Sequence, residues 1–263
     1  MIPDSHVSVV AVGACRLRTA TWGSGAVEIV LLHDGLGSIS QWRETPAEIA
    51  AATGAAVMAY ERAGHGASTP VPDGPWPVDW LHREAEVFGE LLRKMDIVQP
   101  LLVGHSDGGT IALLHAARGG ACSGVVALAA HSWVEPRCSQ AIVGMRRVSD
   151  RIVTGLAPHH DAPAKLFEAW SSAWVSDAFA SWDVRPLLAS VSVPTLVVQG
   201  DQDEYATDAQ LTETAAAIGA NATVMRLAGA GHIVHHEQPA VVAALLAEFY
   251  NCRGVTEAPT QGD

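Results

Sequence analysis

Basic residues are scarce in this sequence. Its 263 positions hold 16 Lys and Arg against 28 Asp and Glu, so the net charge is -12. No basic run could follow a phosphate backbone, and no apolar run approaches the ~20 residues needed to cross a bilayer. A basic N-terminal leader followed by an apolar stretch is also absent. We therefore expect a soluble, cytoplasmic protein that binds neither nucleic acid nor membranes.

Cysteine is also scarce, and its spacing shows no pairs. The four cysteines are Cys15, Cys122, Cys138 and Cys252. This scatter argues against a disulfide framework and against a cysteine-based zinc site. We expect the four side chains to be buried as small apolar groups.

Apolar segments rich in β-branched residues alternate with helical patterns along most of the chain. This alternation predicts an α/β fold, in which a mainly parallel sheet carries helices on both faces. Strands are expected over residues 7–12, 15–21, 28–32, 56–60, 100–104, 124–130, 194–199 and 222–227. Helices are expected over residues 41–52, 78–95, 108–117, 208–218 and 239–250.

Residues 132–190 interrupt the alternation. Helical periodicity there is broken by prolines, no strand is evident, and four of the eight tryptophans occur: Trp133, Trp170, Trp174 and Trp182. We predict that 132–190 is a helical lid inserted between two parts of one core, 1–131 and 191–253. The polar residues 254–263 are expected to form a flexible tail.

A serine lies at the centre of a glycine-rich turn. Gly104-His105-Ser106-Asp107-Gly108-Gly109 matches the G-x-S-x-G nucleophile elbow, with an expected strand before it and an expected helix after it. Larger residues at the flanking positions would collide with the neighbouring elements. We therefore predict that Ser106 is a nucleophile, with a turn that merely joins two elements as the alternative.

A catalytic serine needs a general base and an acid that orients the base. On such elbows the chain order is serine, acid, histidine. His232 follows the last expected strand in Ala228-Gly-Ala-Gly-His, and Asp203 lies in Gly200-Asp-Gln-Asp-Glu after the strand before it. We select His232 as the base and Asp203 as the acid. The acids left open are Asp201, Glu204 and Glu135.

The histidines after His232 resemble a metal-binding pair at first sight. His232, His235 and His236 form His-x-x-His-His, but there is no H-E-x-x-H pattern and no suitable third ligand. We expect no metal, and we expect His235 and His236 to begin the last helix.

Acyl transfer also needs donors for a developing oxyanion, each worth ~3 to 4 kcal/mol. One should be the backbone N–H of Asp107, at the head of the helix after the serine. The other should come from the loop His33-Asp-Gly-Leu-Gly-Ser, with Gly35 as first candidate and Leu36 as second. Alternatively, this loop has its glycines only in order to turn.

At these residues the chain resembles the α/β-hydrolase superfamily over nearly its whole length. The resemblance rests on the loop 33–38, Tyr60-Glu-Arg-Ala-Gly-His-Gly-Ala-Ser, the elbow, Gly200-Asp-Gln-Asp and Gly231-His232. It implies an eight-stranded sheet, a triad of Ser106, Asp203 and His232, a lid and no cofactor. It also implies that residues 62–68 are structural.

One departure from the superfamily concerns the oxyanion loop, where many relatives have His-Gly and this chain has His33-Asp34. A carboxylate aimed into the pocket would oppose an oxyanion. We therefore predict that Asp34 turns away to bond its own loop.

These residues predict hydrolysis of a carboxylic ester or lactone through an acyl-enzyme on Ser106. The tryptophans suggest a small, mainly apolar or aromatic acyl group, contacted by Leu36, Trp133, Trp170 and Trp174, although tryptophans at helical spacing also serve as lid core. Two alternatives stay open: carbon–carbon bond hydrolysis of the meta-cleavage type, and a non-catalytic small-molecule receptor. The only expected partner is a small-molecule substrate, and whether the chain forms a homodimer stays open.

Overall fold

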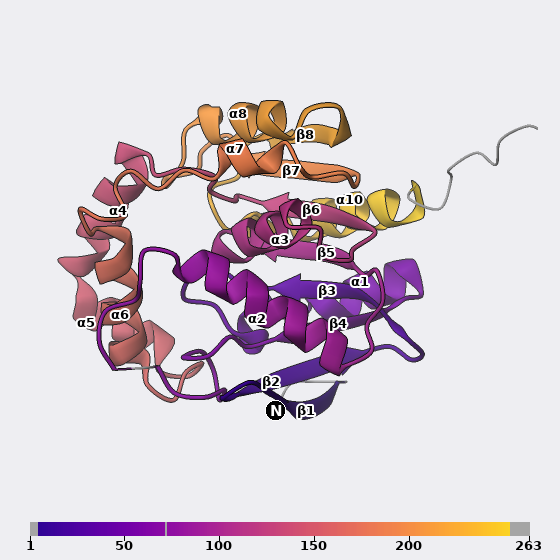
Figure 1. Cartoon of the computed structure of the whole chain (residues 1–263), viewed down its shortest axis with the longest axis horizontal. Helices are drawn as coiled ribbons and strands as arrows, with labels where there is room; N and C mark the ends of the chain where they lie inside the picture. The colour runs from indigo at the N-terminus through magenta and orange to yellow at the C-terminus, as the bar shows by residue number, and fades with distance from the viewer. Residues whose placement is uncertain (1–4, 72, 253–263) are drawn as a thin grey trace, which may run out of the picture.

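The computed structural model describes residues 5–71 and 73–252. Eight strands form one sheet in the order β1-β2-β4-β3-β5-β6-β7-β8 (Figure 1). The strands are β1 His6–Val12, β2 Cys15–Trp22, β3 Val27–Leu32, β4 Ala56–Tyr60, β5 Leu101–His105, β6 Gly124–Leu128, β7 Thr195–Gly200 and β8 Ala222–Leu227. The pairs β1/β2 and β2/β4 are antiparallel and all other pairs are parallel. The predicted fold class is therefore confirmed.

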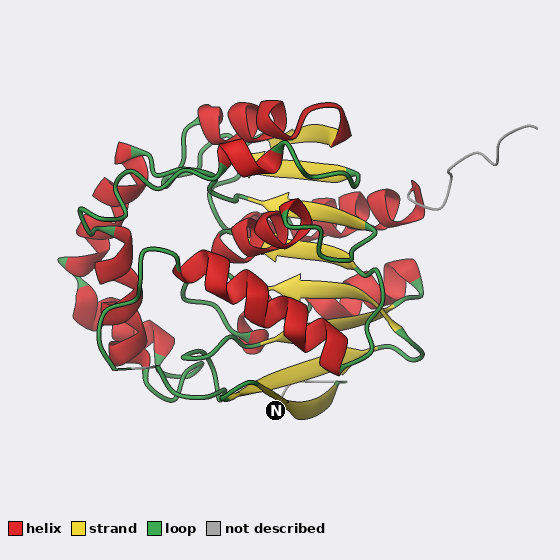
Figure 2. Cartoon of the chain, viewed as in Figure 1, coloured by secondary structure: helices red, strands yellow, loops and turns green. Residues whose placement is uncertain are grey.

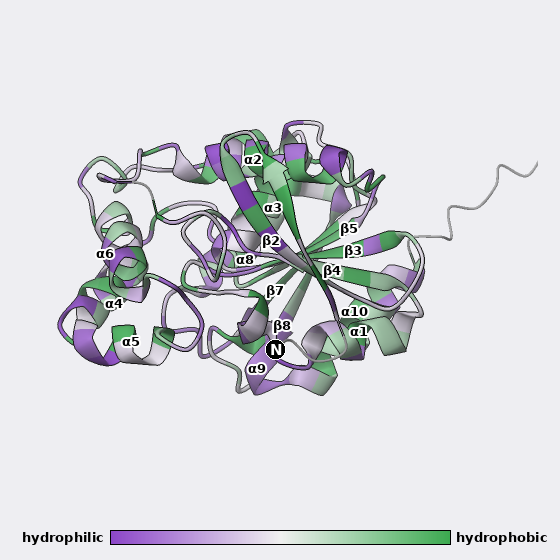
Figure 3. Cartoon of the chain, turned by 90° about the horizontal axis from the view of Figure 1, so that it is seen from below, coloured by the Kyte–Doolittle hydropathy of each residue, from purple (hydrophilic) through white to green (hydrophobic). Residues whose placement is uncertain are grey.

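Helices cover both faces of the sheet (Figure 2). They are α1 Thr45–Thr53, α2 Trp80–Lys94, α3 Asp107–Ala117, α4 Pro136–Arg146, α5 Ser149–Leu156, α6 Pro163–Trp174, α7 Arg185–Leu188, α8 Asp208–Ile218, α9 Val234–Glu237 and α10 Pro239–Cys252, with 3-10 turns η1 Ile39–Trp42 and η2 Gly219–Asn221. Viewed from below the orientation of Figure 1, α2 and α3 lie on one side of the sheet and α1 and α10 on the other (Figure 3). This coverage explains why β4, β5, β6 and β7 are buried along their whole length and are composed mainly of apolar residues.

Helix α2 buries the face that its sequence predicts. Leu81, Ala85, Phe88 and Leu92 are buried against the core, and Met95, just past the helix end, is partly buried. Their spacing of three and four residues places them on one stripe of the helix. This apolar stripe fixes α2 on the sheet.

Two predicted helix starts are wrong. The helix expected from Gln41 begins at Thr45, because Arg43 has a positive φ of 52° and ends the preceding 3-10 turn. His235 and His236 lie in the separate short helix α9, because Pro239 begins α10 at the position where helices favour proline.

Residues 132–190 contain α4, α5, α6 and α7. Helices α4, α5 and α6 lie together beyond one end of the parallel strands, whereas α7 packs beside α8 and the core (Figure 1). Prolines stand in the first turns of α4, α6 and α7, so they begin helices rather than interrupt them. The role of this segment as a lid stays a prediction.

The cysteines are free, and Cys122 and Cys138 are buried. The expectation of burial is wrong for Cys252, which is exposed in the last turn of α10, and Cys15 is only partly buried. Within residues 5–71 and 73–252, no helix is both long and apolar enough to span a bilayer. The expected tail, 254–263, lies outside the described residues.

Candidate active site

Ser106 occupies a sharp turn between β5 and α3. Its backbone is in the left-handed half of φ space, with φ 51° and ψ -119°, a strained conformation for a residue with a side chain. A Cβ atom on Gly104 would overlap the carbonyl oxygen of Gly108, and one on Gly108 would overlap that of Leu32. The glycines therefore let strand and helix approach closely enough to hold the serine on this turn.

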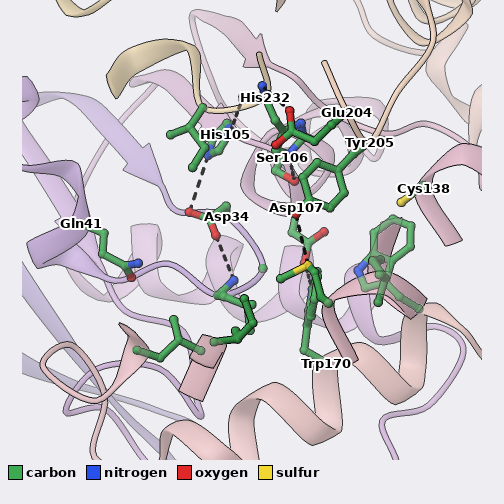
Figure 4. Close-up of a pocket in the computed structure, with 18 of the residues that line it drawn as sticks. Asp34, Gln41, His105, Ser106, Asp107, Cys138, Trp170, Glu204, Tyr205 and His232 are labelled. Carbon is green, nitrogen blue, oxygen red and sulfur yellow. Dashed lines mark hydrogen bonds and ion pairs between the residues drawn. The ribbon is translucent and has the colours of Figure 1, made fainter. Parts of the chain in front are cut away.

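The three side chains selected from the sequence form a continuous hydrogen-bonded array, of which Figure 4 shows Ser106 and His232. His232 Nε2 lies 3.0 Å from Ser106 Oγ, and His232 Nδ1 lies 2.9 Å from Asp203 Oδ2. Ser106, His232 and Asp203 are each less than a tenth exposed. Because β5, β7 and β8 are neighbouring or nearby parallel strands, the loops after their carboxyl ends bring these residues to one edge of the sheet.

The charges of the array support proton uptake by the imidazole. Burial alone would lower the pKa of His232, but the hydrogen bond and negative charge of Asp203 raise it above its ordinary value. Burial would likewise raise the pKa of Asp203, but His232 and the amides of Tyr205 and Ala206 hold it below its ordinary value. A proton arriving at His232 is therefore stabilised as an imidazolium beside a carboxylate.

The other candidate acids have different partners. Asp201 accepts a hydrogen bond from the amide of Gly229, and the oxygens of Glu135 accept from Thr207 at the start of α8. Glu204 accepts from the backbone amide of His232 rather than from its ring. Within the described chain, Asp203 is therefore the carboxylate that is hydrogen-bonded to the His232 imidazole.

The carbonyl groups of the loop after β3 are held from outside the loop. The contacts are Arg62 Nη1 to His33 O at 2.6 Å, Arg62 Nη2 to Asp34 O at 2.7 Å, His65 Nε2 to Gly35 O at 3.0 Å and His160 Nε2 to Leu36 O at 2.9 Å. In a trans peptide the N–H points opposite to the preceding C=O. Because the carbonyl of Asp34 binds Arg62, the N–H of Gly35 points away from Arg62. Residues 62–68 thus hold the candidate oxyanion loop.

Two amides remain available for an oxyanion. Across the described residues, neither the N–H of Gly35 nor that of Asp107 donates to a protein group. The N–H of Leu36, the second candidate, donates to Asp34 Oδ1 at 2.9 Å and is therefore occupied. The geometry favours Gly35 over Leu36.

Asp34 differs in part from its prediction. Its Oδ1 bonds its own loop as expected, but the carboxylate also lines the cavity, where Oδ2 lies 3.6 Å from His105 Nδ1 (Figure 4). Burial would raise the pKa of Asp34, but the nearby imidazole of His105 holds it below its ordinary value. His105 Nε2 in turn donates to the backbone carbonyl of His232 at 3.0 Å. The prediction that Asp34 turns away from the pocket is therefore wrong for Oδ2, which lies beside His105 at the cavity and connects the oxyanion loop with the histidine loop.

A cavity of about 360 Å³ opens beside Ser106. Leu36, Trp170 and Trp174 line it, as the sequence predicts, and further apolar lining comes from α4 and α5 through Ile142, Met145, Ile152 and Leu156. Trp133 is not among the lining residues. Its ring lies under the guanidinium of Arg185, 4.2 Å from the ring centroid, so its expected contact with substrate is wrong.

Asp107 contributes a side chain as well as a backbone amide to the cavity. Its Oδ2 accepts a hydrogen bond of 3.0 Å from Trp170 Nε1, and the carboxyl is 1% exposed. Burial raises its pKa to about 6, against the opposing effects of Arg62 and Trp170. A role for its amide follows from the sequence, whereas the burial of its carboxyl could be found only in the structure.

His131 is a cavity residue that the sequence analysis did not select. It follows β6, is 2% exposed and has its ring centroid 5.7 Å from that of His232. Its position just past the carboxyl end of the strand beside β5 is the signal that could have identified it, because ligands of parallel sheets bind at that edge.

The other histidines of the loop have structural contacts. His235 is buried against the ring of Trp42, and His236 Nε2 donates to the carbonyl of Gln41. Among the described residues, no group of His, Cys, Asp and Glu is arranged to hold a metal ion.

The mainly parallel sheet, the nucleophile elbow and the hydrogen-bonded Ser106, His232 and Asp203 are typical of α/β proteins of the serine hydrolase class. The sequence profile of the Alpha/beta hydrolase family matches residues 29–245, so the chain belongs to this family. Its resemblance to that family is thereby confirmed.

Individual relatives are more distant. The mouse protein Serine hydrolase BPHL is 29% identical over 207 residues, which cover 74% of this chain and 69% of that protein. The crystal structure of MGS-M2, an α/β hydrolase from a Medee basin deep-sea metagenome library, has a TM-score of 0.78 at 17% identity, with 97% of this chain and 100% of that chain covered. An enol-lactonase from Burkholderia xenovorans LB400 has a TM-score of 0.73 at 23% identity, with 93% and 100% covered. The two solved structures show a shared fold.

Proposed function

We propose that this protein is a serine hydrolase that cleaves a carboxylic ester or lactone of a small, mainly apolar or aromatic acyl group. The observation that carries the proposal is the 3.0 Å contact between His232 Nε2 and Ser106 Oγ, with Nδ1 held by Asp203. The kinship to serine hydrolases supports the class of chemistry.

In the acylation step Ser106 Oγ attacks the ester carbonyl carbon and passes its proton to His232 Nε2. The carbonyl oxygen becomes an oxyanion, which accepts hydrogen bonds from the amides of Gly35 and Asp107. The tetrahedral intermediate then expels the alcohol, which takes its proton from His232. Asp203 keeps Nδ1–H oriented and stabilises the transient imidazolium.

In the deacylation step water attacks the acyl-enzyme while His232 accepts a proton from it. A second oxyanion forms in the same place and collapses, which breaks the bond to Ser106 Oγ. The acid is released, and Oγ takes back the proton from His232. A lactone follows the same route, with the alcohol remaining attached to the released acid. The chemistry proposed for these residues requires no cofactor.

The cavity supports the proposed substrate class. Its volume of about 360 Å³ lies at the lower end of small-molecule sites, and its side chains from α4, α5 and α6 are mainly apolar. Trp170 and Trp174 line the cavity that also contains Ser106, which supports their contact with an acyl group. The enol-lactonase among the structural neighbours makes lactones a natural test substrate.

Labelling with an active-site-directed fluorophosphonate tests the nucleophile. The wild-type protein should be labelled on Ser106, and the folded Ser106→Ala variant should not. A panel of aliphatic, aromatic and lactone substrates then tests turnover. Folded wild-type protein that is neither labelled nor active would contradict the proposal and favour a receptor.

A chromogenic dienoate compared with esters separates the proposed reaction from carbon–carbon bond hydrolysis. We expect a higher kcat/KM for the best ester or lactone than for the dienoate. The reverse order would assign the protein to the carbon–carbon alternative.

A further inference from the structure

Hydrogen bonds to the main chain anchor His131 at the edge of the cavity. Thr110 Oγ1 donates to the carbonyl of His131 at 2.7 Å, and the next residue, Ser132, bonds Gln210 and Thr214 of α8. The main chain is thus attached to α3 on one side and to α8 on the other. The imidazole therefore projects from an anchored main chain, and its ring packs against Trp174.

The imidazole of His131 has no hydrogen-bond partner of ordinary geometry among the described residues. Neither Nδ1 nor Nε2 hydrogen-bonds to a group within the described residues, although the side chain is buried and lines the cavity. Its ring packs edge-on against Trp174 at 5.5 Å between centroids. Buried polar atoms are normally paired, so an unpaired imidazole facing a cavity indicates a place for a ligand atom.

The charge state of His131 restricts the kind of ligand. Burial, reinforced by the charge of His232, lowers its pKa to about 4, with Asp203 and the Tyr205 main chain opposing the shift. At neutral pH the ring is therefore uncharged and has one donor and one acceptor nitrogen. Such a ring pairs with a neutral oxygen group and has no charge with which to attract a carboxylate.

The order of the strands indicates where a group bound to His131 would lie relative to the ester bond attacked by Ser106. Strand β5 lies between β3 and β6, so Gly35 and His131 follow strands on opposite sides of the one that leads to Ser106. An ester whose carbonyl oxygen is directed to Gly35 can therefore extend toward the side of His131 and His232.

We propose that His131 is a substrate-binding residue that recognises a neutral hydroxyl or carbonyl oxygen a few atoms from the scissile ester bond. This inference rests on the proposed ester or lactone hydrolysis and deepens it. The preferred substrates are then oxygenated esters or lactones rather than plain hydrocarbon ones.

Matched esters test the inference. Methyl 3-phenylpropanoate is compared with its 2-hydroxy and 3-hydroxy derivatives and with the 2-hydroxyethyl ester, using base uptake at constant pH. For at least one hydroxylated ester we expect kcat/KM about tenfold or more above that of the plain ester. The variant His131→Phe should lose this ratio, and His131→Gln, which keeps a donor and an acceptor, should retain part of it.

A second buried histidine provides the matched control. His115 is also buried and has an unpaired Nε2, but it lies near the opposite end of α3 and does not line the cavity. The variant His115→Phe should keep the wild-type ratio. An unchanged ratio in folded His131→Phe, or no preference in the wild type, would overturn the inference.

A binding measurement keeps this test separate from turnover. In Ser106→Ala protein with ¹⁵N-labelled histidine, the preferred hydroxylated ester should shift the His131 ring signals more than the plain ester does. Equal shifts would contradict the inference, even if the His131 variants fail to fold. Wild-type protein that hydrolyses none of the esters would instead contradict the proposed function, while the binding comparison still decides the role of His131.

Discussion

At the scale of single residues, the site combines ionisable groups whose surroundings move their pKa values in opposite directions. Asp203 and His232 stabilise each other as an ion pair, so their pKa values separate. Asp107, one residue after the serine, has no cationic side chain hydrogen-bonded to it and its pKa rises to about 6. Both carboxyls are buried, but the pKa of Asp203 is lowered by its partner His232 and the pKa of Asp107 is raised.

The pH profile should report the Asp203–His232 pair. Activity falls as the pH drops through the pKa of His232, because the protonated ring cannot accept a proton from Ser106. In Asp203→Asn the pKa of His232 loses its main source of elevation, so the acid limb of kcat/KM should move to lower pH. The maximal rate should fall by about three to four orders of magnitude, the range seen in serine-protease triads. An acid limb that stays in place would show that another group controls it.

Asp107 should make stability depend on pH in the opposite sense to most carboxylates. Its pKa of about 6 in the folded state lies above the unfolded value of about 3.9, so the folded state binds more protons between these values. Folding stability should therefore fall as pH rises through this window, by up to about 3 kcal/mol. The variant Asp107→Asn, which keeps an acceptor for Trp170, should raise Tm at pH values well above 6 and lose the advantage below the unfolded value. Thermal unfolding at both pH values checks this, and an equal change in Tm at both would refute it.

At the scale of elements, glycine spacing and hydrophobic periodicity predicted well those segments whose structure depends on residues close in sequence. The elbow, the strand before it and the helix after it are contiguous in sequence, so glycine spacing and periodicity identify them. The order of elbow, acid and histidine likewise indicated which loops meet. The helix starts at Gln41 and at His235 were wrong because Arg43 and Pro239 set boundaries that periodicity does not show.

Properties that depend on tertiary packing could not be predicted from the same signals. Trp133 follows β6 near the site, yet its ring stacks under Arg185 and so lies outside the cavity. The role inferred for His131 depends on its burial and on the lack of a partner, neither of which is encoded in local spacing. Likewise, no sequence signal indicated that Asp34 Oδ2 lies beside His105 at the cavity.

Arg62, in the loop after β4, orients a backbone amide in the loop after β3. Its guanidinium is 1% exposed and binds the carbonyls of both His33 and Asp34, which orients the amide of Gly35. A lysine keeps the charge but lacks the two-pronged geometry. In Arg62→Lys we expect kcat to fall by about ten- to a hundredfold with little change in KM, because the donor acts mainly in the transition state.

Steady-state kinetics of Arg62→Lys should be compared with those of Arg83→Lys. Arg83 lies on α2, where it pairs with Asp79 at the surface, so its replacement should leave kcat unchanged. A rise in KM at constant kcat in Arg62→Lys would mean that the loop serves ground-state binding instead.

At the scale of the whole molecule, the segment 132–190 and the sheet share one hydrophobic cluster. Leu166 and Trp174 of α6 belong to the same buried cluster as Leu81 of α2, Leu102 of β5 and Val197 of β7. The bond from Trp170 to Asp107 adds a polar connection between α6 and the elbow. Although the segment is inserted in sequence, its packing is continuous with that of the core.

We therefore expect the segment and the core to unfold together. The segment contributes four of the eight tryptophans to the fluorescence signal, whereas far-ultraviolet circular dichroism reports on the helices and strands of the whole chain. The two signals should give coincident thermal transitions. The variant Leu166→Ala removes a fully buried side chain of α6 and should destabilise the protein by about 2 to 5 kcal/mol. If packing is continuous, both probes should move by the same amount, whereas Val143→Ala, at an exposed site on α4, should move neither appreciably. A fluorescence trace that divides into two transitions, of which Leu166→Ala shifts only one, would show that 132–190 unfolds as an independent unit, as a detachable lid would.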